Sequence, residues 1–137
     1  MADQGNVQKV KDLFNAFARN EIAAVPAMLD ENVDWHNYGP AEMGYTTPRR
    51  GREQVMAFFK EIDELFDHEQ FQANEFIAQG DYVVVTGSEF VRAKSTGISL
   101  TNQWCMVFTF RDGKIVRFRC YEDTARVLVA TRGKTND

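Results

Sequence analysis

The sequence predicts an α+β fold, in which a curved sheet of antiparallel strands carries helices on one face. Two observations lead to this prediction. In the first half of the chain, apolar residues recur at intervals of three and four, which is typical of amphipathic helices. From about residue 69 the interval changes to two, which is typical of strands, and short turn sequences separate the strands. Helices followed by a run of strands favour a sheet with helices packed against it.

The composition indicates one domain of 137 residues with a net charge of −4. Charges of both signs are spread along the chain, which lacks the basic stripe of a nucleic-acid-binding protein. No apolar run approaches the ~18 residues of a membrane span, and the start lacks the apolar centre of a secretory signal. We therefore expect a cytoplasmic protein that binds neither nucleic acid nor membrane. The aromatic content exceeds what a minimal core needs, and suits a lined cavity or a dimer interface.

Two helices are expected before the first strand. The first spans about residues 5–20, ends at Asn20 and carries an apolar stripe of Val7, Val10, Leu13, Phe14 and Phe17. The second is short, has Pro26 in its first turn, and places Ile22, Val25, Met28 and Leu29 on one side. A strand from Val33 to Asn37 then runs into a turn at Gly39-Pro40, and residues 41–50 form a loop.

The clearest helical stripe follows Gly51, at Val55, Phe58, Phe59, Ile62, Leu65 and Phe66, and is expected to pack into the core. His68 comes after this helix and is expected at the surface, near the helix C-terminus. Four strands are then predicted, near 69–78, 82–93, 98–110 and 114–124. The turns between them are Gly80-Asp81, Ser95-Thr96-Gly97 and Asp112-Gly113.

The last hairpin has a register that can be worked out, because Asp-Gly between strands is typical of a two-residue turn. Arg111 then faces Lys114, and the residue numbers of every pair of facing residues add up to 225. This register places Arg119, Tyr121 and Asp123 on one face with Trp104, Met106 and Phe108. Polar groups among large apolar side chains are typical of a ligand pocket, although an Arg119–Asp123 ion pair on a solvent-facing sheet would share this pattern.

The same register puts Cys105 and Cys120 side by side on the opposite face, together with Val107, Val116 and Phe118. A disulfide could form there, but reduced, packed thiols are expected in a cytoplasmic protein. The spacing of the two Cys and two His is not that of a zinc site, so no metal is expected. We expect this apolar outer face to pair with a second copy of the chain as a homodimer.

The order and spacing of several segments resemble one known family. After the helix pair come "DENVDWHNYGP", "GREQVMAFFKEI", "DYVVVTG" and "STGISLTNQWCMVFTFRDGKIVRFRCYED". The chain is similar to the SnoaL-like polyketide cyclase and ketosteroid isomerase branch of the nuclear-transport-factor-2-like (NTF2-like) superfamily. The resemblance implies a cystatin-like cone, with a sheet wrapped around the N-terminal helices and a pocket at its open end. It implies a single domain over residues 1–137, with a core of about 5–130.

The resemblance also implies working residues. The general base of ketosteroid isomerases maps to His36, or to Trp35 if the alignment slips by one residue, and the catalytic Asp of polyketide cyclases maps to Asp123. The enolate-binding Tyr and Asp of ketosteroid isomerases map to Leu13 or Phe14 and to Met106, so steroid isomerisation by that mechanism is not expected. The remaining substrate-binding residues are expected to be Trp35, Tyr38, Trp104, Met106, Phe108, Arg119 and Tyr121.

The functional hypothesis is a cofactor-free enzyme that carries out proton transfer on a small apolar carbonyl compound, by isomerisation, aldol cyclisation or dehydration. His36 and Asp123 would exchange protons with the substrate. The alternative is a non-catalytic module of the same fold that binds a small molecule or dimerises. His36 could equally be a structural histidine, and Glu42 either lies at the pocket mouth or is a solvated loop carboxylate.

Overall fold

The computed structural model describes residues 2–133, and their side chains from residue 4. It contains three α-helices, α1 (Ala2–Ala18), α2 (Arg52–Leu65) and α3 (Thr124–Arg132), and three short 3-10 turns, Ile22–Ala24, Pro26–Met28 and Ala41–Met43. The strands are β1 (Leu29–Asn37), β2 (Arg49–Arg50), β3 (Phe66–Gln79), β4 (Tyr82–Ala93), β5 (Ser99–Arg111) and β6 (Lys114–Glu122).

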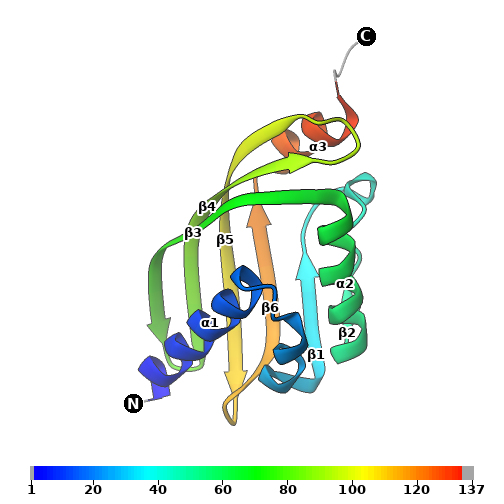
Figure 1. Ribbon diagram of the computed structural model, residues 1–137. Helices are drawn as coiled ribbons and strands as arrows, with labels where there is room; N and C mark the ends of the chain where they lie inside the picture. The colour runs from blue at the N-terminus through cyan, green and yellow to red at the C-terminus, as the bar shows by residue number, and fades with distance from the viewer. Residues whose placement is uncertain (1, 134–137) are drawn as a thin grey trace.

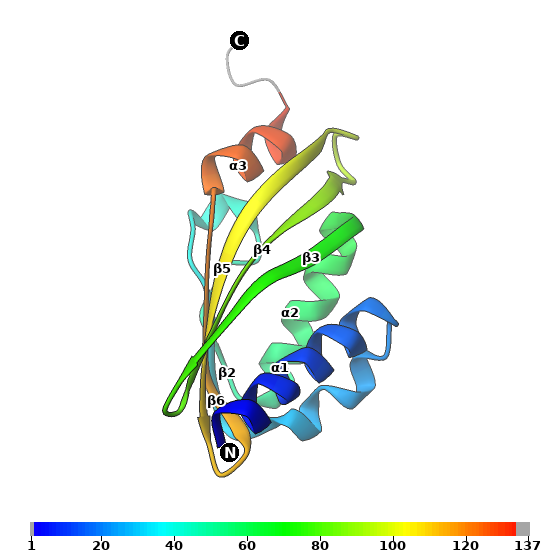
Figure 2. The same ribbon diagram turned by 90° about the vertical axis from the view of Figure 1, so that its left-hand side faces the viewer.

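All six strands form one mixed sheet in the order β2-β1-β6-β5-β4-β3. Strands β3 to β6 are antiparallel neighbours, whereas β1 lies parallel to β6. The sheet bends around α1 and α2, which lie on one of its faces, and α3 crosses one end (Figure 1). In the turned view the opposite face carries no helix (Figure 2). The predicted α+β cone is therefore confirmed.

The two helices pack against the sheet through the apolar stripes that the sequence indicates. Val10, Leu13 and Ala16 of α1 are buried, and α1 is followed by Asn20 in a left-handed conformation (φ 58°). Val55 and Phe58 are the buried residues of α2, which starts after Gly51. Gly51 has φ 86°, a conformation that favours glycine. Within residues 2–133, no helix is long and apolar enough to cross a membrane.

The last hairpin departs from the predicted register. Asp112 and Gly113 both have positive φ, as the expected two-residue turn requires, and Phe110 pairs with Ile115. The next pair is Thr109 with Arg117, so Val116 is an extra residue in β6 and partners from there on sum to 226. A one-residue bulge exchanges the two faces of a strand for every later residue. The predicted faces of β6 beyond Ile115 are therefore wrong.

Helix α3 was not expected, because the sequence pattern extends the last strand to residue 124. Instead β6 ends at Glu122 and Asp123 caps the helix, with its carboxylate accepting a hydrogen bond from the Arg126 amide. An Asp before a helical run is a preferred N-cap, because it satisfies a free backbone N–H. Arg132 of α3 forms an ion pair with Glu42, which fastens the helix to the turn Ala41–Met43. Glu42 is thus an exposed partner of α3.

A candidate acid–base site in an aromatic cavity

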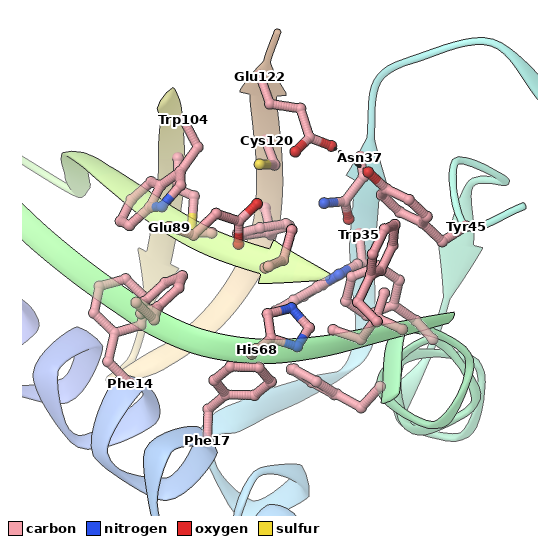
Figure 3. A pocket seen from close by; sticks show the side chains of 18 of the residues that line it. Phe14, Phe17, Trp35, Asn37, Tyr45, His68, Glu89, Trp104, Cys120 and Glu122 are labelled. Carbon is pink, nitrogen blue, oxygen red and sulfur yellow. Dashed lines mark hydrogen bonds between the residues drawn. The ribbon is translucent and has the colours of Figure 1, made fainter. Parts of the chain in front are cut away.

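A cavity of about 100 Å³ lies between the inner face of the sheet and helices α1 and α2. Its walls are mainly aromatic, and Figure 3 shows them surrounding a few polar groups. Trp35 of β1 stacks on Phe118 of β6, with the ring centroids 3.9 Å apart. Trp104 of β5 stacks on Phe71 of β3, with the ring centroids 4.9 Å apart. Such a concave, apolar space with few polar groups is typical of a small-molecule site.

Four of the expected substrate-binding residues line this cavity: Trp35, Trp104, Met106 and Phe108. Tyr38, Arg119 and Tyr121 do not. Arg119 and Tyr121 lie on the outer face because the bulge at Val116 turns the odd-numbered side chains of β6 outward. His36 of β1, which pairs with Arg119, and Tyr38, which follows β1, lie on the outer face as well. The expectation that Arg119, Tyr121 and Asp123 converge inside the pocket is wrong.

The outer face holds these side chains in a network of its own. Arg119 donates from Nε to the Tyr38 hydroxyl at 3.0 Å and from Nη2 to Asp34 at 3.0 Å. The hydrogen bond from Arg119 is the main cause of the lowered pKa of Asp34. The Tyr38 ring lies against His36 at 4.4 Å and Tyr121 at 5.1 Å. The ion pair of Arg119 is thus with Asp34 and not, as considered from the sequence, with Asp123.

Inside the cavity, the structure brings together two carboxyl groups that the sequence reasoning did not select. Glu89 comes from β4 and Glu122 from the end of β6, and both line the cavity (Figure 3). The Tyr45 hydroxyl donates to Glu122 Oε2 at 2.6 Å, and Asn102 Nδ2 donates to Glu122 Oε1 at 3.0 Å. Asn102 is also the cross-strand partner of Glu89.

The pKa values of both carboxyl groups are raised. Burial raises the pKa of Glu122 above its usual value, and the hydrogen bonds from Tyr45 and Asn102 offset this only in part, because both donors favour the carboxylate. Burial, followed by the negative charge of Glu122, raises the pKa of Glu89 to about 7, against a smaller opposing effect of Asn102. No Lys or Arg is among the described residues that line the cavity. Both carboxyl groups therefore hold protons more firmly than free carboxyl groups do, and Glu89 is about half protonated near pH 7.

Two further groups complete the polar part of the cavity. His68 was expected at the surface, but it is the third residue of β3 and lines the cavity between Phe17 and Phe66. Burial is the main cause of its lowered pKa, so the neutral imidazole is favoured. Cys120 also lines the cavity, and burial raises the pKa of its thiol. Cys105 pairs with Tyr121 on the outer face, so the two free cysteines are not direct neighbours.

A signal for the missed residues does exist in the sequence. Glu89 is an acidic side chain that interrupts the apolar alternation of Val83, Val85 and Val91, all of which are buried. A carboxylate at an inward position is costly unless it is paired or protonated, and so indicates a function. Glu122 follows the apolar Phe118 and Cys120 at intervals of two, but the register predicted from the turn assigned these side chains to the outer face.

Comparison with known proteins agrees with the fold. The family described as the SnoaL-like domain matches residues 10–118, and the chain therefore belongs to this family within the NTF2-like superfamily. No curated protein matches the chain.

Solved structures give the same classification. An NTF2-like protein from Burkholderia xenovorans LB400 is 31% identical, with 94% of this chain and 97% of that one covered and a TM-score of 0.85. An NTF2-like protein of unknown function from Burkholderia pseudomallei K96243 is 28% identical, with 93% of this chain and 97% of that one covered and a TM-score of 0.86. A proposed SnoaL-like polyketide cyclase from Jannaschia sp. CCS1 is 17% identical over 96% and 94%, with a TM-score of 0.81, which shows the fold alone.

Proposed function

We propose that the protein is an enzyme that transfers protons to and from a small, largely apolar carbonyl compound in the cavity. The observation that carries this proposal is the Glu89–Glu122 pair, which lies among aromatic walls with no lining cation in the described chain. A general acid or base works best when its pKa lies near the working pH. Glu89, with a pKa of about 7, meets this condition.

The two carboxyl groups have different roles in the proposed chemistry. Glu122 accepts hydrogen bonds from Tyr45 and Asn102, which favour its carboxylate form, and its negative charge contributes to the raised pKa of Glu89. In its ionised form, Glu89 removes a proton from the carbon beside the substrate carbonyl, which leaves an enolate. The same proton, now on Glu89, is then returned to another carbon in an isomerisation, or to a departing hydroxyl group, which leaves as water in a dehydration.

The cavity walls support an apolar, ring-bearing substrate. Trp35, Phe108 and Phe118 offer flat apolar surfaces, and a volume of about 100 Å³ suits a small molecule. The Tyr45 hydroxyl and the Asn102 amide already bond to Glu122, so the proposed substrate makes its main contacts with aromatic rings. No cofactor is required by this reaction, because both proton transfers use side chains of the chain itself.

Exchange of hydrogen for deuterium tests the proposal without knowledge of the natural substrate. We expect the protein to catalyse exchange of the α-protons of cyclic ketones such as cyclohexanone and 1-indanone in D₂O, followed by proton NMR. Glu89→Gln should abolish this exchange. Asp123→Asn is the matched control, since it makes the same chemical change at the cap of α3 and should retain exchange.

Two results would contradict the proposal. Exchange that persists in Glu89→Gln would remove Glu89 from the chemistry. Tight binding of a ketone without any exchange, in wild type and variants alike, would favour the alternative of a non-catalytic binding module.

We also propose that the protein is a cytoplasmic homodimer that pairs through the outer face of the sheet. Support comes from Ile77, Tyr82 and Tyr121, which are exposed by 56%, 52% and 48% and are left uncovered by the helices (Figure 2). Val107 and Cys105 belong to this face, but Phe118 and Cys120, which the sequence had assigned to it, point into the cavity. Two free thiols agree with a reducing compartment.

A further inference from the structure

A second hollow adjoins the cavity on the helix side of the sheet, between the end of α1, helix α2 and the start of β3. Five residues border both spaces: Phe17, Phe59, Phe66, His68 and Phe71. A residue that lines two spaces separates them by the thickness of one side chain. The wall between the cavity and this hollow is therefore thin, and it is built almost entirely from aromatic rings.

His68 is the polar member of this wall. Its ring meets Phe17 edge-on at 5.3 Å and Phe66 at 6.2 Å, and Figure 3 shows it below the carboxyl pair, beside Phe17. Within residues 4–133, no side-chain hydrogen bond fixes the imidazole; the contacts with aromatic rings hold it in place. Rotation of this one side chain would therefore break no side-chain hydrogen bond.

The charges along this path are mostly negative. Asp63 and Glu69 line the hollow together with Lys60, while Asp67 is neutralised by ion pairs with Arg92 and Lys94. Beyond the wall lie Glu89 and Glu122, without a Lys or Arg among the described lining residues. An anion that reached the cavity would meet a carboxylate at low dielectric, where like charges repel strongly.

We propose that ligands reach the cavity through this wall, past His68, and that the site accepts uncharged molecules and rejects anions. The substrate class is thereby narrowed to neutral carbonyl compounds without a carboxylate or phosphate group. This inference rests on the proposed use of the cavity as a ligand site, but it does not depend on catalysis. Trp35 and Trp104 are the two tryptophans of the chain and both line the cavity, so tryptophan fluorescence reports occupancy.

Charge selection is tested with benzamide and benzoate, which have nearly the same size and shape and differ in charge at pH 7.5. We expect benzamide to quench tryptophan fluorescence with at least tenfold higher affinity than benzoate. In Glu122→Gln, which replaces an acidic group of the cavity by a neutral amide, the ratio should fall to about threefold or less. Equal affinities in the wild type, or no binding of benzamide, would overturn the inference.

The route is tested by stopped-flow fluorescence with benzamide. His68→Ala should speed both association and dissociation at least threefold, because the truncated side chain opens the wall. Val127→Ala is the matched control, since Val127 lines the cavity from α3 but does not border the hollow. His68→Phe, which keeps the wall closed, should slow both rates and serves where the alanine variant does not fold. If benzamide associated and dissociated faster in Val127→Ala than in the His68 variants, the entrance would lie at α3 instead.

The outcomes separate this inference from the proposed function. Benzamide binding past His68 without deuterium exchange of ketones would leave the entrance intact and remove the catalysis. Deuterium exchange of ketones with equal binding of benzamide and benzoate would support the catalysis and overturn the selection of uncharged ligands.

Discussion

At the scale of single residues, Glu89 carries most of the functional argument. Its pKa of about 7 in the folded protein exceeds the value of 4.5 for an unperturbed Glu. The folded state therefore binds more protons than the unfolded state between about pH 4.5 and 7. A raised carboxyl pKa stabilises the folded state at low pH, and this contribution is lost as pH rises through that window.

This linkage predicts a pH-dependent effect of Glu89→Gln. Because glutamine stays neutral, the variant should escape the loss of stability and exceed the wild type by roughly 3 kcal/mol at pH 8. The difference should shrink towards pH 4.5. Urea unfolding at several pH values measures it, and a difference that does not change with pH would contradict the raised pKa.

The residues of the site differed in how far the sequence could predict them. The aromatic walls followed from composition and alternation, and Trp35, Trp104, Met106 and Phe108 all line the cavity as expected. The carboxyl pair could not be predicted in the same way. Its members come from strands that are distant in the sequence, and the pKa of Glu89 arises from burial and from the charge of Glu122, which are properties of the folded chain.

At the scale of elements, the bulge in β6 accounts for the main error. A two-residue Asp-Gly turn fixes the register only as far as the first irregularity, and Val116 is three residues beyond that turn. The bulge itself gives no distinct signal in "KIVRFRCYE". The alternation does, because apolar Phe118 and Cys120 share one face and Arg117 and Arg119 the other, but the register counted from the turn was followed instead. Arg119 was placed in the pocket and is on the outer face for this reason. His36 was placed there by the resemblance, and the neighbouring Trp35, the stated alternative, is the residue that lines the cavity.

The role of Asp123 is also an element-scale question, with a testable answer. As the N-cap of α3 its carboxylate accepts a hydrogen bond from Arg126, and replacement of an N-cap Asp by Ala costs about 1 kcal/mol. Asp123→Ala should therefore lower the unfolding free energy by about 1 kcal/mol and leave deuterium exchange of bound ketones nearly unchanged. A loss of exchange with normal stability would restore the catalytic role expected from the sequence.

Close contact between strands makes a second element-scale prediction. A Cβ at Gly87 would lie 2.3 Å from the Gln72 carbonyl oxygen and 2.3 Å from the Trp104 ring, so β3 and Trp104 must both shift. Gly87→Ala should destabilise the protein by roughly 3 kcal/mol or more, measured by urea unfolding. Gly5→Ala is the control, since a Cβ there meets nothing within 4 Å and alanine favours the helix. Equal stability of the two variants would contradict this packing.

At the scale of the whole molecule, the order and spacing of elements were enough to predict the fold. The helical stripes, the period-two strands and their turns specify a sheet with helices on one face, and the structure has this architecture. The parallel pairing of β1 with β6 and the helix α3 across the end depend on contacts between distant segments. Local periodicity does not contain that information.

The outer face gives the whole-molecule prediction. If two copies pair through it, wild-type protein should sediment as a dimer at micromolar concentration. Replacing the exposed Ile77 and Tyr82 by Glu should yield a folded monomer, because charges would be buried in the interface. Replacing Ile98 by Glu is the matched control. Ile98 is exposed just before β5, so this variant should remain a dimer. A wild-type monomer at micromolar concentration would contradict the pairing.

The proposed chemistry depends on a Glu89 carboxyl group that titrates near neutral pH inside the cavity. The most direct measurement is an NMR titration of ¹³C-labelled glutamate side chains, with Glu89→Gln used to assign the Glu89 carboxyl signal. We expect that signal to titrate near pH 7. Titration of Glu89 near 4.5, the value for an unperturbed carboxyl, would contradict the account.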